Sequence, residues 1–229
     1  MGSETLNIVI REIEEKLVAR PKEKTTSISQ DEARFIYEFL KKHDIKRTME
    51  VGFAYGYSAA CIIAATGSDH VAIDPFQSSF DCAGMKNLKA LGYEHRCELR
   101  EQPSHVALPE LLKEGRRFQF IFVDGGHRFD DIFTDWYFSD LLLEKNGYVL
   151  FHDLWMRSTQ MVAAFIQTNR ADYRAIPAPL KNLVLFQKGD RKDERSWDHF
   201  EEFYNTKSAG ILDKLMKRLP RARPRKHRD

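Results

Sequence analysis

Residues 48–65 read TMEVGFAYGYSAACIIAA, and this stretch decides the fold. An apolar segment that contains the acid Glu50 ends at Gly52, and a second glycine, Gly56, stands just before a run with helical character. Glycine has no Cβ, so it can take positive φ and lets the backbone approach a ligand closely. We therefore expect a strand, an open turn and a helix in that order.

The same alternation continues along the chain. Short apolar segments predict strands at 48–52, 70–73, 95–99, 118–123 and 147–152, and segments with helical spacing separate them at 57–65, 79–91, 104–114, 129–143 and 158–168. Five strand–helix units in series predict a parallel sheet covered on both faces, a Rossmann-like doubly wound α/β fold. No helix separates YRAI (173–176) from NLVLFQK (182–188), so the last strand should run antiparallel to a neighbour.

Two further helices are expected before the first strand. Residues 5–19 carry apolar side chains at helical spacing, and Pro21 stops that run. Ser29 and Glu32 have the spacing of a capping box, which predicts a helix that ends near His43. We divide the chain into an N-terminal helical extension (1–26), a central domain (27–190) and a C-terminal helical piece with a basic tail (191–229).

Composition narrows the classes of protein. The 229 residues are 42% hydrophobic, yet no apolar run approaches the ~18 to 20 residues of a membrane helix, and no secretory pattern opens the chain. We expect no membrane insertion and a cytoplasmic location. Cys61, Cys82 and Cys97 are odd in number and widely spaced, so we expect buried, reduced thiols.

The charge is unevenly distributed. Residues 214–229 hold eight Lys or Arg against one Asp, so this tail carries +7 and the preceding 213 residues carry −5 of the total of +2. Such a tail could contact RNA, an anionic membrane or an acidic partner, although most basic ends are simply solvated. The acidic body lacks a basic face studded with aromatic residues, which argues against nucleic acid as the main partner.

Polar residues follow the first two predicted strands. Ligands of an open parallel sheet gather beyond the carboxyl ends of its strands. Glu50 could receive a cationic amine there, directly or through water, and Asp74, 22 residues beyond Gly52, could accept both hydroxyls of a ribose. A dinucleotide fingerprint would need a glycine where Ala54 stands and a third glycine after Gly56, so NAD is disfavoured and another nucleoside-containing ligand is favoured.

Polar residues also follow the fourth and fifth predicted strands. The sequence DGGH (124–127) follows the fourth, and His152 and Asp153 end the fifth. Adjacent strands lie ~4.8 Å apart, so these side chains should converge on one pocket.

With these motifs the chain resembles the class I S-adenosylmethionine-dependent methyltransferases, particularly small bacterial O-methyltransferase-like domains of the methyltransferase domain 24 type. The resemblance extends from Ser27 to Lys188. It rests on MEVGFAYGYS (49–58), on Asp74, and on FVDGGHRFDDIFTDW (122–136) followed by GYVLFHD (147–153). It implies a seven-stranded, mostly parallel sheet with an antiparallel last strand, S-adenosylmethionine as cofactor and a small-molecule acceptor.

The resemblance also implies roles for individual residues. Cofactor contacts are expected from Glu50, Gly52, Gly56 and Ser58 around the methionine part, Asp74 at the ribose, Glu101, Gln102 and Ser104 near the adenine, and Asp124 between cofactor and acceptor. One departure is Asn146 before Gly147, where many relatives have paired glycines; Asn tolerates the positive φ that this turn needs.

The reaction would require little of the protein. A sulfonium methyl is already electrophilic, so the enzyme aligns an acceptor and, for a hydroxyl, removes a proton. His152 or His127 could take that proton, although His127 could instead anchor its loop; Asp124 stands beside them. A divalent metal on Asp124, His152 and Asp153 could also assist, and the imidazole would favour manganese, iron or zinc over magnesium.

Three functions follow from these patterns. The leading one is a small-molecule O-methyltransferase, and helices before the first strand could pair two subunits into a homodimer. The second is an RNA-modifying methyltransferase that uses the basic tail. The third is a non-catalytic S-adenosylmethionine-binding partner protein.

Overall fold

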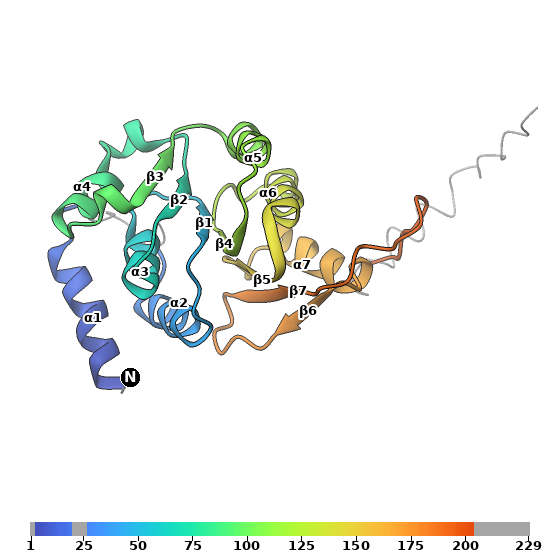
Figure 1. Cartoon of the computed structure of the whole chain (residues 1–229), viewed down its shortest axis with the longest axis horizontal. Coiled ribbons are helices and arrows are strands. Elements are labelled where there is room, and N and C mark those ends of the chain that lie inside the picture. The colour runs from blue at the N-terminus through green and yellow to red at the C-terminus, as the bar shows by residue number, and fades with distance from the viewer. Residues whose placement is uncertain (1–2, 20–26, 204–229) are drawn as a thin grey trace, which may run out of the picture.

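A seven-stranded mixed sheet forms the centre of the molecule, and helices cover both of its faces (Figure 1). The computed structural model describes residues 3–19 and 27–203. The strand order is β3-β2-β1-β4-β5-β7-β6. The strands are β1 (Thr48–Val51), β2 (His70–Ile73), β3 (Cys97–Arg100), β4 (Phe118–Val123), β5 (Leu143–Phe151), β6 (Tyr173–Ile176) and β7 (Val184–Lys188).

Strand directions agree with the sequence patterns. The pairs β3–β2, β2–β1, β1–β4 and β4–β5 are parallel, whereas β7 runs antiparallel to both β5 and β6. The Rossmann-like α/β fold and the antiparallel last strand are therefore confirmed.

The helices divide between two layers. They are α1 (Ser3–Lys16), α2 (Gln30–Lys42), α3 (Tyr57–Thr66), α4 (Ala83–Ala90), α5 (Ser104–Lys113), α6 (Phe129–Leu142) and α7 (Arg157–Asn169). Helices α1 to α4 pack with Phe120 and Phe122 on one face of the sheet, and α5 to α7 pack with Ile121 and Val123 on the other. Because side chains alternate along a strand, β4 supplies both layers and is apolar almost throughout.

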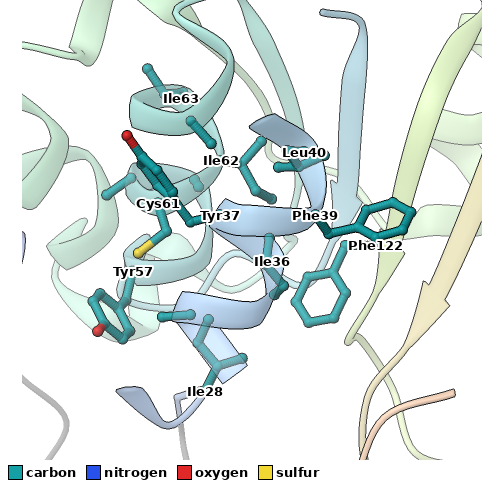
Figure 2. Close-up of a cluster of buried hydrophobic side chains, with 14 of the residues drawn as sticks. Ile28, Ile36, Tyr37, Phe39, Leu40, Tyr57, Cys61, Ile62, Ile63 and Phe122 are labelled. Atoms are coloured by element: carbon teal, nitrogen blue, oxygen red, sulfur yellow. The ribbon is translucent and has the colours of Figure 1, made fainter. Parts of the chain in front are cut away.

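The layer on the α1–α4 side is built around the contact between α2 and α3. Figure 2 shows Ile36 and Leu40 of α2 facing Cys61 and Ile62 of α3, with Phe122 of β4 beside them. All five of these side chains are almost completely buried. This packing fixes α2 over the sheet and so determines where its first turn lies.

The start of α2 has the expected capping box. The Ser29 hydroxyl accepts a hydrogen bond from the Glu32 N–H at 3.3 Å, and Glu32 Oε2 accepts one from the Ser29 N–H at 2.7 Å. Together the two contacts satisfy backbone donors that the first helical turn leaves unpaired.

Some element boundaries differ from expectation. Strand β5 begins at Leu143, immediately after α6. The expected helix over 79–91 is split into a 3-10 turn, Gln77–Phe80, and α4, because Asp81 and Cys82 both adopt positive φ. Asn146 has φ 62°, as the expected turn requires.

The expectation of three buried thiols is wrong for Cys82. Cys61 is buried and Cys97 is partly buried, but Cys82 is exposed at the junction before α4. All three are free thiols, and burial raises the pKa of Cys61 and of Cys97.

Two further findings concern regions outside the sheet. Residues 191–203 form no helix, and the rest of the expected C-terminal piece, including the basic tail at 214–229, lies outside the described residues. Within the described residues, no helix is both long enough and apolar enough to cross a membrane.

Candidate functional site

A cavity of about 540 Å³ opens at the carboxyl ends of β1, β2, β4 and β5. The strands are in register at this edge, since Val51 pairs with Ile73 and Val123, and Val123 pairs with Phe151. The residue after each strand therefore reaches the same place. Of the residues predicted from the sequence, the cavity is lined by Gly52, Ser58, Asp74, Ser104, Asp124, His127, His152 and Asp153.

The loop after β1 needs glycine at its first position. Gly52 has φ +93°, and a Cβ added there would lie 2.0 Å from the backbone oxygen of Asp124. Ala54 and Gly56 also have positive φ, 42° and 69°. Gly52 and Ala54 line the cavity, whereas Gly56 supports the loop from behind as the N-cap of α3.

Asp74 holds this loop in place. Its carboxylate accepts hydrogen bonds from the N–H groups of Ala54 at 2.7 Å, Phe53 at 3.2 Å and Phe76 at 2.8 Å. The side chain is buried but still contributes to the cavity wall. A single carboxylate thus joins the loops after β1 and β2, and sequence spacing alone could not indicate this second role.

Glu50 lies below the cavity rather than in its wall. Its carboxylate is completely buried within β1, and the nearest cationic candidate is His70 Nε2 at 3.6 Å. Neither carboxylate oxygen accepts a well-formed hydrogen bond from the described residues. Burial raises the pKa of Glu50, although His70 and Ser58 favour its charged form. A contact between Glu50 and a ligand would have to pass through the layer that contains Ser58, which does line the cavity.

The residues predicted near an adenine divide into two groups. Ser104, the first residue of α5, lines the cavity. Glu101 is exposed and Gln102 is partly buried, and neither belongs to the cavity wall.

His152 is surrounded by carboxylates. Its Nδ1 lies 3.0 Å from Asp124 Oδ1 and 3.4 Å from Asp153 Oδ1, and its Nε2 lies 3.2 Å from Glu32 Oε1. Burial lowers the pKa of His152, but the three carboxylates outweigh burial and raise that pKa to about 12. The three carboxylates therefore favour the protonated form of the ring.

The contacts with His152 also change the pKa values of the surrounding acids. Burial opposes the ionisation of Glu32 and of Asp153, but the contacts with His152 prevail and lower the pKa of each to about 2. For Asp124 burial is the larger effect and its pKa is raised. The contacts within the cluster thus favour a positive charge on His152 and negative charges on Glu32 and Asp153.

Sequence reasoning missed two members of this cluster. Glu32 was recognised only as part of the capping box, for which it uses Oε2, while its Oε1 contacts His152. Asn182, in the segment before β7, donates from Nδ2 to Glu32 at 3.1 Å and lies 3.0 Å from His152 Nε2. Only the packing of α2 and the antiparallel return of β7 bring these residues to the edge of the sheet.

His127 has a different environment. Its side chain is 48% exposed and lines the cavity, and its Nε2 lies 2.8 Å from Asp153 Oδ2. Its backbone oxygen accepts a hydrogen bond from the Ser158 hydroxyl at 2.7 Å. The residue therefore anchors its loop through the backbone while its ring forms a His–Asp pair that faces the cavity.

Asp124, His152 and Asp153 also form a group with the spacing of metal ligands. Their ligand atoms lie within 4.8 Å of one another. The Nδ1 atom of His152 is buried without a well-aligned hydrogen bond. Because Nε2 on the other side of the ring faces Glu32, Nδ1 is directed at Asp124 and Asp153. One imidazole and two carboxylates fit a transition metal better than magnesium, which prefers oxygen ligands.

Comparison with known proteins supports a methyltransferase. A family model described as a methyltransferase domain matches residues 49–154. A caffeoyl-CoA O-methyltransferase from Medicago sativa is 31% identical over 134 residues, 56% of this chain and 53% of that protein. Tricin synthase 1 from Oryza sativa subsp. japonica is 39% identical over 104 residues, 42% of this chain and 41% of that protein. The chain spans about half the length of these curated relatives.

Solved structures share the fold. The S-adenosylhomocysteine-bound methyltransferase PaMTH1 of Podospora anserina superposes with a TM-score of 0.67 at 17% identity, covering 83% of this chain and 97% of that one. The O-methyltransferase TomG of Streptomyces achromogenes, in complex with S-adenosylmethionine, gives 0.64 at 16% identity, covering 82% and 91%. The motifs, the matched domain and the shared fold agree with one another: residues 49–154 form a methyltransferase domain similar to those of the O-methyltransferase-like class I S-adenosylmethionine-dependent enzymes.

Proposed function

We propose that this protein transfers a methyl group from S-adenosylmethionine to a hydroxyl of a small molecule. The observation that carries the proposal is that residues from different strand ends line one cavity. Gly52, Ser58 and Asp74 come from the segments after β1 and β2, and Asp124, His127 and Asp153 come from those after β4 and β5. A nucleoside cofactor held by the first set would present its methyl group to an acceptor beside the second.

The cofactor side offers the contacts that such a ligand requires. Without a Cβ at Gly52, the backbone after β1 can approach the methionine part closely. The Asp74 carboxylate lies at the end of β2, where an acid can accept ribose hydroxyls. Ser104 lies at the start of α5, near the expected adenine.

The acceptor side contains exposed aromatic side chains. Phe76 lines the cavity and is 62% exposed, and Trp155 is 68% exposed while its indole N–H donates to Asp153 at 2.8 Å. Aromatic rings at this rim could stack on a planar acceptor. The names of the curated relatives make caffeoyl-CoA the first acceptor to test.

His127 is the stronger candidate for the proton acceptor. Three carboxylates surround His152 and favour its protonated form, which makes it a poor acceptor for a proton from a hydroxyl. His127 is paired with one carboxylate and is open to the cavity, and imidazole is the side chain that most often serves as a general base. Asp153 would orient the His127 ring, and His152 would hold Asp124 and Asp153 in place.

A divalent metal remains part of the proposal. Asp124, His152 and Asp153 would hold it, with His152 deprotonated at Nδ1 when the ion binds. When bound, such an ion lowers the pKa of an acceptor hydroxyl. A cytoplasmic location, a homodimer and the three-part division of the chain remain predictions from the sequence.

Isothermal titration with S-adenosylmethionine tests the cofactor site, and Asp74→Ala with Asp69→Ala forms a matched pair. Asp74 lines the cavity, whereas Asp69 is an exposed acid outside it. We expect the first substitution to weaken binding at least tenfold and the second to leave it unchanged. Transfer of labelled methyl from the cofactor to caffeoyl-CoA and to compounds in a cell extract, followed by mass spectrometry, then tests the reaction. Absence of cofactor binding by the wild-type protein would refute the proposal.

A further inference from the structure

A buried asparagine connects the segment that directly follows α1 to the loop after β1. Asn87 lies on α4 and is completely buried. Its Oδ1 accepts hydrogen bonds from the N–H groups of Val18 at 2.9 Å and Ala19 at 2.8 Å. Its Nδ2 donates to the backbone oxygens of Ala19 at 2.7 Å and Tyr55 at 2.9 Å. One carboxamide thus uses all its donors on segments that are distant in the sequence.

The same face of α4 presses directly on this loop. Gly84 precedes Asn87 by three residues, so the two lie on one face of the helix. A Cβ at Gly84 would lie 2.3 Å from the ring of Phe53 and 2.8 Å from the backbone oxygen of Ala54. Phe53 and Ala54 both line the cavity. Helix α4 therefore buttresses the cavity-lining loop at close range.

A second contact joins α1 to the cavity wall. The hydroxyl of Tyr57, a residue that lines the cavity, donates to Glu14 Oε1 at 2.8 Å. Figure 1 shows α1 running along the outside of this layer, with its C-terminal end close to α4. The apolar side chains of Leu6, Ile10 and Ile13 are buried against the same core.

We propose that Asn87 is a positioning residue that makes α1 and the cofactor loop, residues 52–57, a single binding unit. The inference rests on the proposed function in one respect, namely that the cofactor occupies this loop. Coupling between two sites is reciprocal. A cofactor that orders the loop must therefore strengthen the docking of α1, and loosening α1 must weaken cofactor binding by the same factor. The sequence patterns described α1 only as an appended helix.

Amide hydrogen exchange on the full-length protein tests this inference. In the wild type, S-adenosylmethionine should slow exchange in residues 6–17, which lie outside the cavity. Asn87→Asp keeps the acceptor for Val18 and Ala19 but removes both donated bonds, so exchange in residues 6–17 should accelerate even without ligand. Lys89→Ala is the matched control, because Lys89 is exposed on the same helix.

Titration calorimetry provides the second readout. Asn87→Asp should raise the Kd for S-adenosylmethionine about tenfold and leave the binding stoichiometry unchanged. A tenfold change in affinity lies within the usual range of coupling between two sites. Lys89→Ala should leave the Kd unchanged. Tyr57→Phe, which removes only a hydroxyl, should give a smaller shift in the same direction.

The outcomes separate this inference from the proposed function. The coupling would be overturned if the Asn87→Asp protein folds and the amides of α1 exchange at the wild-type rate, whether or not cofactor binding is weaker. Faster α1 exchange without ligand in Asn87→Asp supports the tether itself. Failure of the wild type to bind the cofactor contradicts the proposed function, and in that case the ligand-dependent half of the coupling is wrong as well.

Discussion

Replacing Glu32 by Gln should destabilise the protein through His152 and not through α2. Gln retains the capping box, because an amide oxygen can accept the Ser29 N–H as the carboxylate does. It removes the negative charge that lies 3.2 Å from His152 Nε2. The substitution therefore separates the two roles that Glu32 combines.

The expected magnitude follows from the pKa of Glu32. Although burial opposes its ionisation, the contacts with His152, Ser29 and Asn182 lower this pKa from 4.5 to about 2. One pKa unit corresponds to about 1.4 kcal/mol, so ionised Glu32 contributes about 3 kcal/mol to the free energy of unfolding at neutral pH, and the substitution should remove up to that amount because Gln keeps the contact with the Ser29 N–H. For a chain of this size, a loss of that amount lowers Tm by roughly 6–12 °C.

The pH dependence has a definite sign. A carboxyl whose pKa is lowered by folding stabilises the protein above its unfolded pKa, and this stabilisation is lost as the pH falls from 4.5 toward 2. The difference between wild type and Glu32→Gln should therefore shrink from about 3 kcal/mol at pH 7 to about 1 kcal/mol at pH 3. The raised pKa of His152 acts in the opposite direction: its contribution is complete below pH 6.5 and declines as the pH rises toward 12.

Urea denaturation at pH 7 and pH 3 measures both quantities. Ser29→Ala is the matched control, since it breaks the capping box but leaves the Glu32–His152 contact; it should cost about 1 kcal/mol at either pH. If Glu32→Gln costs no more than Ser29→Ala, or if its cost does not change with pH, the charge argument is refuted.

Other predictions address the cavity. Gly52→Ala should lower the free energy of unfolding in a urea melt by at least about 3 kcal/mol and abolish cofactor binding. The reason is that the new Cβ would stand at a positive φ and lie 2.0 Å from the backbone of Asp124. Near-normal stability would contradict this. Ala54→Gly should stabilise the fold by up to about 1 kcal/mol, because it relieves a φ of 42°, and a loss of stability would show that the turn is not strained. His127→Gln should lower kcat more than tenfold without changing the Kd of S-adenosylmethionine in calorimetry, and a normal kcat would exclude His127 as the base. If a divalent metal is part of the site, dialysis against a chelator should lower activity, and manganese should restore it better than magnesium; activity unaffected by chelation would exclude the metal.

The arrangement of strands was predictable because two-sided burial leaves a simple pattern. Central strands that helices cover on both faces are mostly apolar on both faces. For this reason the ends of β1, β2 and β4 were predicted to within one residue. The residues that follow these strands were then assigned to one edge by topology alone. Boundaries differ at 79–91, where the positive φ of Asp81 and Cys82 interrupts an otherwise helical pattern, and at the starts of β3 and β5.

The contacts within the site could not be predicted in the same way. Glu32 and Asn182 reach His152 from parts of the chain 120 and 30 residues away, and no local pattern encodes those distances. Asn87 looked like an ordinary helical residue, although it joins two remote segments. The contact between Glu50 and the cofactor, directly or through water, stays a prediction: its side chain is completely buried below the cavity wall, a depth that sequence spacing does not indicate.

The two histidines show why environment, and not position, assigns chemical roles. Both stand near the ends of adjacent strands, and sequence reasoning preferred His152 as the base. Three carboxylates around a buried ring favour the protonated form of His152, whereas His127 has one carboxylate partner and faces the cavity. A proton acceptor must be reachable by the acceptor hydroxyl, and of these two rings His127 is the one that combines partial exposure with a single acidic partner. Asp153 contacts both rings, so the buried pair and the exposed pair form one charge-coupled unit.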